Sequence, residues 1–281
     1  MCTLEKRGNV YILTLTGNDE HRLNPTLLDS IRSALRRLRS EPTFPSSVLI
    51  TTAHGKFFSN GYDLSWARST TSQSITSSRY RMMSSKLRGL VSDLISLPMP
   101  TIAAITGHAS AAGMVFALCH DYVIMRRDRG FLYMSELDIG LVVPVWFVAL
   151  LECKIGNPKA RRDTVLKAAK LTAEMAVGKG IVDMVGGNAE ETVEAAVRLG
   201  EEMFKRKWDG QVYAKNRMVI LGKVLDKLGF DETVEEENGK GNRSKFFEED
   251  NGKEWIKIVI GAWIIMAIIW RFVVLSGLLP M

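Results

Sequence analysis

Glu136 is the residue whose surroundings most clearly predict acid–base chemistry. It lies in the segment MSELDIGLVVPVW, residues 134–146, where most of its neighbours are apolar. Removal of water by such neighbours raises the pKa of a carboxyl group toward the range that is useful for proton transfer. Asp138 is the competing carboxylate, but its type and place suit a surface or capping position better. Taken alone, the segment also fits a glutamate that caps a helix.

Two earlier segments could bind an oxygen atom through backbone amides. KFFSNGYDL, residues 56–64, follows a predicted strand and contains Gly61, and a glycine in such a loop lets N–H groups point at a ligand. ITGHASAAGM, residues 105–114, also leads from a strand into a helix, and its small residues leave the first helical amides open. Each segment alone also fits an ordinary turn or tight helix packing.

The elements that must position these segments alternate between strands and helices. Apolar, β-branched runs predict strands at 9–16, 47–52, 101–105 and 122–125, with a shorter strand at 131–134. Asn24 and Pro25 begin a helix, residues 69–78 form a mobile surface segment before a long helix that ends near Leu97, and 113–119 is helical. Residues 157–228 are essentially helical. This order predicts an α/β protein with parallel βα units.

Composition excludes several classes of protein. The 281 residues are 46% hydrophobic and 24% charged, with a formal net charge of +6, which argues against a disordered, collagen-like or polytopic membrane protein. The basic residues form no stripe interleaved with aromatic ones, so nucleic acid is not an expected partner. Three cysteines and four histidines lack the spacing of a zinc site, so no metal is expected. The charged first ten residues do not predict secretion.

The C-terminal part of the chain has a different composition. Residues 231–254 are charged and lack periodicity, which predicts a solvated linker. Residues 258–279 contain Arg271 as the only charged side chain, and as a helix these 22 residues would extend about 33 Å. We consider three interpretations: a membrane anchor, a helix buried in an assembly, and an alternative C-terminus.

The three chemical segments, in this order, resemble the crotonase (enoyl-CoA hydratase/isomerase) superfamily over about residues 5–205. LTAEMA, residues 171–176, and GIVD, residues 180–183, extend the resemblance. It implies a crotonase-type spiral of ββα units with a helical C-terminal region that packs a homotrimer. The chain then divides into a catalytic domain at 1–230, a linker at 231–254 and a hydrophobic tail at 255–281. The resemblance also implies an oxyanion hole made by the backbone N–H groups of Tyr62 and Ala112.

The carboxylates separate the reactions of this superfamily. The position of the second glutamate of hydratases holds Val115, and the position of the additional aspartate of dienoyl-CoA isomerases holds Pro144. Glu136 alone remains, in a pattern that looks like delta-3, delta-2 enoyl-CoA isomerase, and the loop at 58–64 resembles its plant members. The resemblance implies that Glu136 carries a proton from C2 to C4 of a 3-enoyl-CoA, without cofactor or metal. A hydratase and a non-catalytic acyl-CoA-binding module are the alternatives.

The resemblance also implies contacts with the acyl-CoA thioester, a compartment and an assembly. The expected substrate-binding residues are Lys56, Ser59, Asn60, Gly61, Asp63, Leu64, Gly113 and Ser135. A peroxisomal location is expected, although the chain ends Leu279-Pro280-Met281 rather than in a Ser-Lys-Leu-like tripeptide. Membrane association through residues 258–279 is a further expectation.

Overall fold

The computed structural model describes residues 1–40 and 47–229. These residues belong to one compact unit, Met1–Glu236. The predicted linker at 231–254 and the apolar tail at 255–281 lie outside the described residues, and so does the division of the chain at residue 230.

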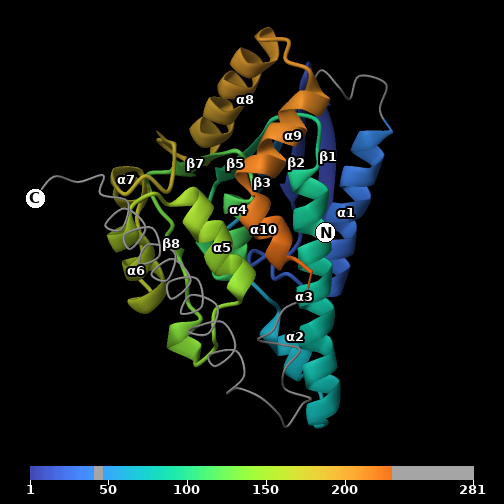
Figure 1. Ribbon diagram of the computed structural model, residues 1–281, viewed down its shortest axis with the longest axis vertical. Helices are drawn as coiled ribbons and strands as arrows, with labels where there is room; N and C mark the ends of the chain where they lie inside the picture. Colours follow the sequence, from blue (N-terminus) through green and yellow to red (C-terminus); the bar gives the residue numbers. More distant parts are fainter. Residues whose placement is uncertain (41–46, 230–281) are drawn as a thin grey trace, which may run out of the picture. The chain divides into compact units, whose positions relative to one another are not determined.

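A six-stranded sheet forms the centre of the described unit (Figure 1). Its first two strands are antiparallel, and all later neighbours are parallel. In spatial order the strands are β1 (Cys2–Arg7), β2 (Val10–Leu15), β3 (Val48–Ala53), β5 (Thr101–Ile105), β7 (Tyr122–Arg126) and β9 (Met184–Gly186).

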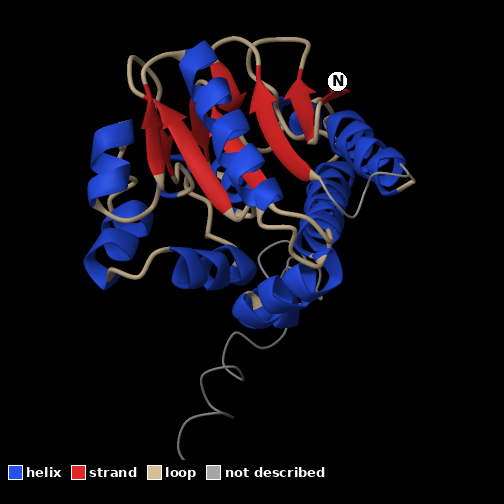
Figure 2. Cartoon of the chain, turned by 90° about the horizontal axis from the view of Figure 1, so that it is seen from above, coloured by secondary structure: helices blue, strands red, loops and turns tan. Residues whose placement is uncertain are grey.

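Helices cover both faces of this sheet, which explains why its inner strands are apolar throughout. Ile50 and Ile102 pack with Ala196 of helix α8 (Ala189–Lys205) in one buried cluster, whereas the alternate residues Leu49 and Ala103 belong to the other. Helix α8 contacts β2, β3, β5, β7 and β9, and Figure 2 shows it crossing the strands. The main core therefore lies between the opposite face and the remaining helices.

A second, parallel sheet of three short strands carries the site. It consists of β4 (Phe57–Ser59), β6 (His108–Ser110) and β8 (Leu132–Tyr133). Three successive segments of the chain each place one strand in the large sheet and the next in the small sheet, as β3–β4, β5–β6 and β7–β8. The α/β class and the repeated units expected from the sequence are confirmed.

The helices surround this framework, and no helix in residues 1–40 and 47–229 has the length and apolarity needed to cross a membrane. Helix α1 begins as predicted, because Oδ1 of Asn24 accepts a hydrogen bond from Leu27 N at 3.0 Å. Besides α8, the helices are α1 (Pro25–Arg39), α2 (Leu64–Arg68), α3 (Gln73–Ile95), α4 (Ala112–Leu118), α5 (Val145–Lys154), α6 (Pro158–Leu166), α7 (Ala173–Gly178), α9 (Gly210–Ile220), α10 (Gly222–Lys227) and the 3₁₀ turn η2 (Leu137–Ile139).

Two predictions about elements were wrong in detail. The region at 157–228 is interrupted by strand β9, which pairs with β7. The surface segment predicted at 69–78 is helical from Gln73, because Ser72 caps α3. The first residues, for which no element was predicted, form strand β1, an edge strand whose charged residues face outward while Cys2 and Leu4 pack on the core.

Candidate active site

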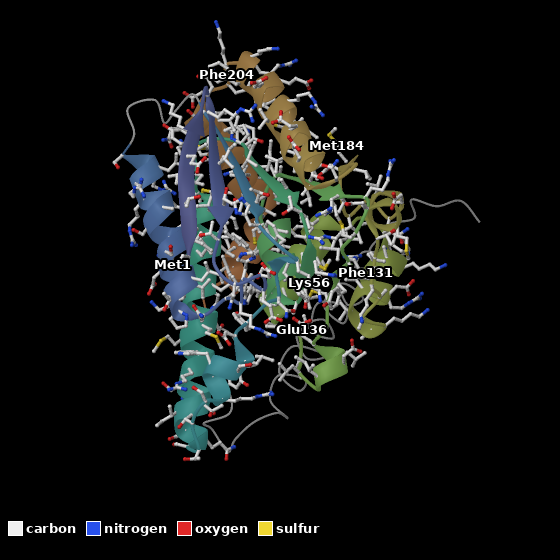
Figure 3. All side chains as sticks on the ribbon, turned by 180° about the vertical axis from the view of Figure 1, so that it is seen from behind. Met1, Lys56, Phe131, Glu136, Met184 and Phe204 are labelled. Carbon is white, nitrogen blue, oxygen red and sulfur yellow. The ribbon has the colours of Figure 1, made fainter. Side chains whose placement is uncertain are left out.

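The three chemical segments meet because the strands that carry them are parallel neighbours. Strand β4 leads into Tyr62, β6 leads into Ala112, and β8 leads into Glu136. The carboxyl ends of parallel strands lie at one edge of a sheet, so the order of this small sheet brings the segments together. Lys56 and Phe131, near the starts of β4 and β8, and Glu136, beyond the end of β8, are labelled in Figure 3.

Glycines allow the first two segments to approach closely. Gly61 has φ 71°, and a Cβ atom there would lie 3.0 Å from the carbonyl oxygen of Ser110 and 3.4 Å from the amide nitrogen of Ala112. A Cβ atom on Gly113 would lie 2.3 Å from the carbonyl oxygen of Ser59. These positions therefore require glycine, and the loop that contains Tyr62 lies directly against the start of α4.

The amide of Ala112 is placed by an unusual backbone turn. Ala111 has φ 50° and ψ −124°, a conformation that non-glycine residues rarely adopt. Its own N–H donates to the carbonyl of Tyr133 at 2.9 Å, which ties this turn to β8. Ala112 is the first residue of α4, so its N–H has no acceptor within that helix.

Glu136 is a buried carboxyl group for which residues 1–40 and 47–229 supply no ion-pair partner. Its exposed fraction is 6%, and its Oε2 atom has no hydrogen-bond partner among the described residues. Burial raises its pKa to about 7, against a smaller opposing effect of the hydrogen bond from its own amide. The carboxyl group is therefore divided between its acid and base forms near neutral pH. Asp138 is exposed in η2, as expected.

Hydrogen bonds fix the segment around Glu136 to the residues that follow it and to strand β6. Its carbonyl oxygen accepts hydrogen bonds from the N–H groups of Ile139 at 3.2 Å and Leu141 at 2.9 Å. The hydroxyl oxygens of Ser135 and Ser110 lie 3.3 Å apart, which links the segment to β6. Exposed apolar side chains follow Glu136 along the chain: Leu137, Ile139, Leu141, Val142, Val145 and Val148.

Several residues expected to bind substrate have side chains that bond within the protein. The Ser59 hydroxyl donates to the carbonyl of His21 at 2.8 Å, and Asn60 Nδ2 lies 3.5 Å from Glu20 Oε1. Asp63 caps α2 through a hydrogen bond from Trp66 N at 2.9 Å. These side chains shape the loop. Leu64 begins α2 and is half-buried.

Basic side chains lie near the amino-terminal ends of the short strands, whereas Tyr62, Ala112 and Glu136 follow their carboxyl-terminal ends. Lys56 is exposed, with Nζ 5.8 Å from the centre of the Phe57 ring. The pKa of His108 is lowered first by burial and then by the positive charges of Lys56, Arg129 and Lys170. The sequence named Lys56 as a candidate and gave no indication that Arg129 and Lys170 lie near it, because only the pairing of the strands brings these residues together.

The segment at 19–24 was also missed as part of the site. Asn24 was predicted to cap α1, and its Nδ2 also donates to Asp63 Oδ2 at 3.2 Å. His21 bonds to the carbonyl of Phe57 through Nδ1 at 2.9 Å. No sequence pattern marked these contacts, because they join residues about 40 positions apart.

This two-sheet α/β fold has a buried carboxyl group and two closely apposed loops at one edge of the small sheet, an arrangement that suits acid–base chemistry. Residues 5–224 match the family model described as enoyl-CoA hydratase/isomerase, and the chain belongs to this family.

The chain is also similar to individual proteins and solved structures named as enoyl-CoA isomerases or hydratases. The chain is 63% identical to enoyl-CoA delta isomerase 1, peroxisomal, of Arabidopsis thaliana, over 80% of this chain and 91% of that protein. It is 50% identical to enoyl-CoA delta isomerase 2, peroxisomal, of the same plant, over 83% and 98%. A crystal structure of an enoyl-CoA hydratase from Mycobacterium ulcerans superimposes with a TM-score of 0.73 at 19% identity, covering 85% of this chain and 99% of that chain, which supports the fold.

Proposed function

We propose that this protein moves the double bond of a 3-enoyl-CoA to the 2-position, as a delta-3, delta-2 enoyl-CoA isomerase in the β-oxidation of unsaturated fatty acids. The observation that carries the proposal is the state of Glu136, a 6% exposed carboxyl group without a hydrogen-bond partner for Oε2 in the described part of the chain. The 63% identity to a protein named enoyl-CoA delta isomerase supports the same activity.

One carboxyl group is sufficient for this reaction. The Glu136 carboxylate removes a proton from C2, the electrons pass into the thioester carbonyl, and a dienolate forms. The N–H groups of Tyr62 and Ala112 donate hydrogen bonds to the developing negative charge on the thioester oxygen. The protonated Glu136 then returns its proton to C4, which leaves the double bond between C2 and C3. One such donor contributes about 3–4 kcal/mol to the stability of the transition state.

The polar part of the substrate fits the basic end of the small sheet. Coenzyme A carries several phosphate charges, and Lys56, Arg129 and Lys170 supply positive charges near His108. Gly61 and Gly113 leave backbone space beside the thioester, while Asn60 and Leu64 border the same loop. Ser59, Asp63 and Ser135 contribute by holding the loops through their hydrogen bonds. No cofactor and no metal take part in the proposed reaction.

Hydration is the alternative activity, and it needs a second group that activates water. Val115, at the position of the second glutamate of hydratases, is fully buried in α4 and cannot transfer protons. We therefore expect little or no addition of water to a 2-enoyl-CoA.

The test compares the wild-type chain with Glu136→Gln and Asp138→Asn on a 3-enoyl-CoA and on a 2-enoyl-CoA. Asp138 is the matched control, because it lies two residues away and is exposed. We expect the wild type and Asp138→Asn to form the conjugated thioester, and Glu136→Gln to lose at least about 100-fold in kcat. Equal turnover by all three proteins would assign the proton transfer to another group. Binding without turnover by the wild type would instead support the acyl-CoA-binding module.

We further propose a homotrimer that packs through the C-terminal helices. The exposed fractions of Val212, Val219 and Ile220 on α9 are 56%, 81% and 69%, and an apolar face of this kind favours burial against another chain. A cavity of about 600 Å³ borders the same helix, with Trp208 and Tyr213 among its lining residues. Light scattering of the full chain should give the mass of a trimer, and Val219→Glu should reduce it. A monomeric wild type would contradict this assembly.

The proposed compartment is the peroxisome, supported by the two Arabidopsis relatives that carry this word in their names. A fluorescent fusion of the chain in Arabidopsis cells should coincide with a peroxisomal marker. Membrane association through residues 258–279, which lie outside the described residues, is a separate proposal. It predicts that the full chain floats with phospholipid vesicles and that a chain ending at residue 230 does not.

A further inference from the structure

Residues 19–24, which we call the clamp segment, run alongside the loop that leads to Tyr62. Three hydrogen bonds between backbone N–H and carbonyl groups join them. The N–H group of Phe57 donates to the carbonyl oxygen of Asp19 at 3.0 Å, and that of Asn60 donates to the carbonyl oxygen of Glu20 at 2.8 Å. In the other direction, the N–H group of Leu23 donates to the carbonyl oxygen of Gly61 at 2.7 Å. Strand β4 pairs with β6 on its other side, with an irregular register between Phe57 and Ser59. The clamp segment therefore replaces a neighbouring strand for β4.

His21 is the residue of the clamp segment that holds both ends of β4. Its Nδ1 atom lies 2.9 Å from the carbonyl oxygen of Phe57, the first residue of the strand. Its own carbonyl accepts the hydroxyl hydrogen bond of Ser59, the last residue, at 2.8 Å. Ser59 is followed within three residues by Tyr62, whose amide is the first proposed oxyanion donor.

The state of His21 suits a fixed contact. Its exposed fraction is 2%, and its φ of 43° lies in the left-handed region, which costs energy for a residue other than glycine. Because a carbonyl oxygen can only accept, Nδ1 carries the hydrogen. Burial lowers the pKa of the ring, which keeps it neutral, and Nε2 has no hydrogen-bond partner among the described residues. Within the described residues, the His21 ring therefore makes its hydrogen bond through Nδ1, to the carbonyl oxygen of Phe57.

We propose that His21 is a positioning residue, which sets the place of the Tyr62 amide by fixing β4 at Phe57 and Ser59. The inference rests on the oxyanion hole of the proposed function. Strand β4 has only three residues and pairs with β6 over a short, irregular register. The loop that follows it can therefore shift by a fraction of an ångström when one of its supports is lost. Donors that are displaced from the developing charge lose much of their effect on rate, with little effect on the binding of the remote coenzyme.

Two substitutions of His21 separate its contact from its bulk. Asparagine tolerates the left-handed conformation, and its side-chain amide can donate to Phe57 in place of Nδ1. Leucine fills a similar volume and cannot donate. Thr51→Val is the matched control, because it removes the 2.7 Å hydrogen bond from β3 of the large sheet to the other buried histidine, His120, in the turn that follows α4. Ser59→Ala removes the second bond between His21 and β4 and replaces His21→Leu if that variant does not fold.

The measurements are kcat, KM, the melting temperature, and the infrared carbonyl stretch of bound hexanoyl-CoA labelled with ¹³C at the thioester. We expect His21→Leu to lower kcat about 10- to 100-fold with KM within about threefold, and to move the carbonyl band toward its position in water. His21→Asn should stay within about threefold of the wild type in kcat. Thr51→Val should lower the melting temperature and leave the band unchanged.

A folded His21→Leu with the wild-type band and kcat would overturn the proposal, and so would a failure of asparagine to restore the band. If Thr51→Val moved the band equally, His21 would have a merely structural role. Hexanoyl-CoA is saturated, so the infrared measurement needs no turnover. A wild type that shifts the band but does not isomerise a 3-enoyl-CoA would therefore contradict the proposed function and leave the positioning role of His21 in place.

Discussion

The burial of Glu136 has a consequence for stability that can be measured apart from activity. Its pKa is about 7 in the folded protein, against an ordinary value of 4.5 in an unfolded chain. The folded state therefore keeps the proton of this group between these two pH values, while the unfolded state releases it. The stability that is present below pH 4.5 is lost as the pH rises toward 7, because ionisation then favours unfolding.

The size of this effect follows from the two pKa values. Relative to the fully protonated state, Glu136 lowers the free energy of unfolding by about 1 kcal/mol at pH 5 and by about 3 kcal/mol at pH 8. Glutamine has a similar shape and does not ionise. The stability difference between Glu136→Gln and the wild type should therefore grow by about 2–3 kcal/mol in favour of the variant from pH 5 to pH 8.

Urea unfolding of both full-length proteins at pH 5 and pH 8, at one fixed protein concentration, measures this difference. All other titrating groups are common to the two proteins and cancel in the comparison. The variant should gain stability at pH 8 while it loses isomerase activity. Parallel pH dependences would refute the reasoning, because they would mean that folding does not raise the pKa of Glu136.

Three further predictions concern pH, packing and a buried ion pair. Because the base form of Glu136 starts the reaction, kcat/KM of the wild type should fall about tenfold per unit below pH 7 and level off above it; a flat profile from pH 5 to pH 9 would contradict this. Gly113→Ala should lower the free energy of unfolding by at least about 2 kcal/mol, because the added Cβ atom would clash with Ser59. Gly156→Ala is the control: its Cβ atom would have no atom within 4 Å, so this variant should unfold in urea like the wild type. Arg217 donates to Asp121 at 2.6 Å and to four backbone carbonyls, so Arg217→Met should lower the free energy of unfolding by about 3–5 kcal/mol in the same urea measurement. Arg7→Met, which removes one partner of an exposed ion pair, should leave the unfolding midpoint unchanged. Equal midpoints for the two variants would contradict this prediction.

The large sheet and the burial of the Glu136 carboxyl group could be predicted because their signals are local. The apolar runs at β3, β5 and β7 are long enough to identify buried strands, and the apolar neighbours of Glu136 indicate its burial. Gly61 was singled out as a glycine that lets loop N–H groups face a ligand, and Gly113 as a substrate-binding residue; the structure gives the protein atoms that both glycines approach.

Of the small sheet, the sequence predicted only the short strand at 131–134, which corresponds to β8, and predicted neither β4 nor β6. Strands β4 and β6 have three residues each and β8 has two, too few for an alternating pattern, and their pairing depends on contacts between distant segments. The resemblance assigned Ser59 and Asp63 to the substrate, which stays a prediction, and the structure adds that their side chains hold the loop itself. His21 gave no signal, because its partner Phe57 is 36 residues away and a lone histidine has no diagnostic spacing.

The central claim, that one carboxyl group carries the proton from C2 to C4, can be tested most directly with a 3-enoyl-CoA that is fully deuterated at C2. Because the Glu136 carboxyl group is only 6% exposed, it should exchange slowly with water during one turnover. We predict that mass spectrometry or NMR of the 2-enoyl product formed in ordinary water finds a substantial fraction of the molecules with deuterium at C4. A product that carries only solvent hydrogen at C4 would contradict the account, because a second group or water would then supply the proton.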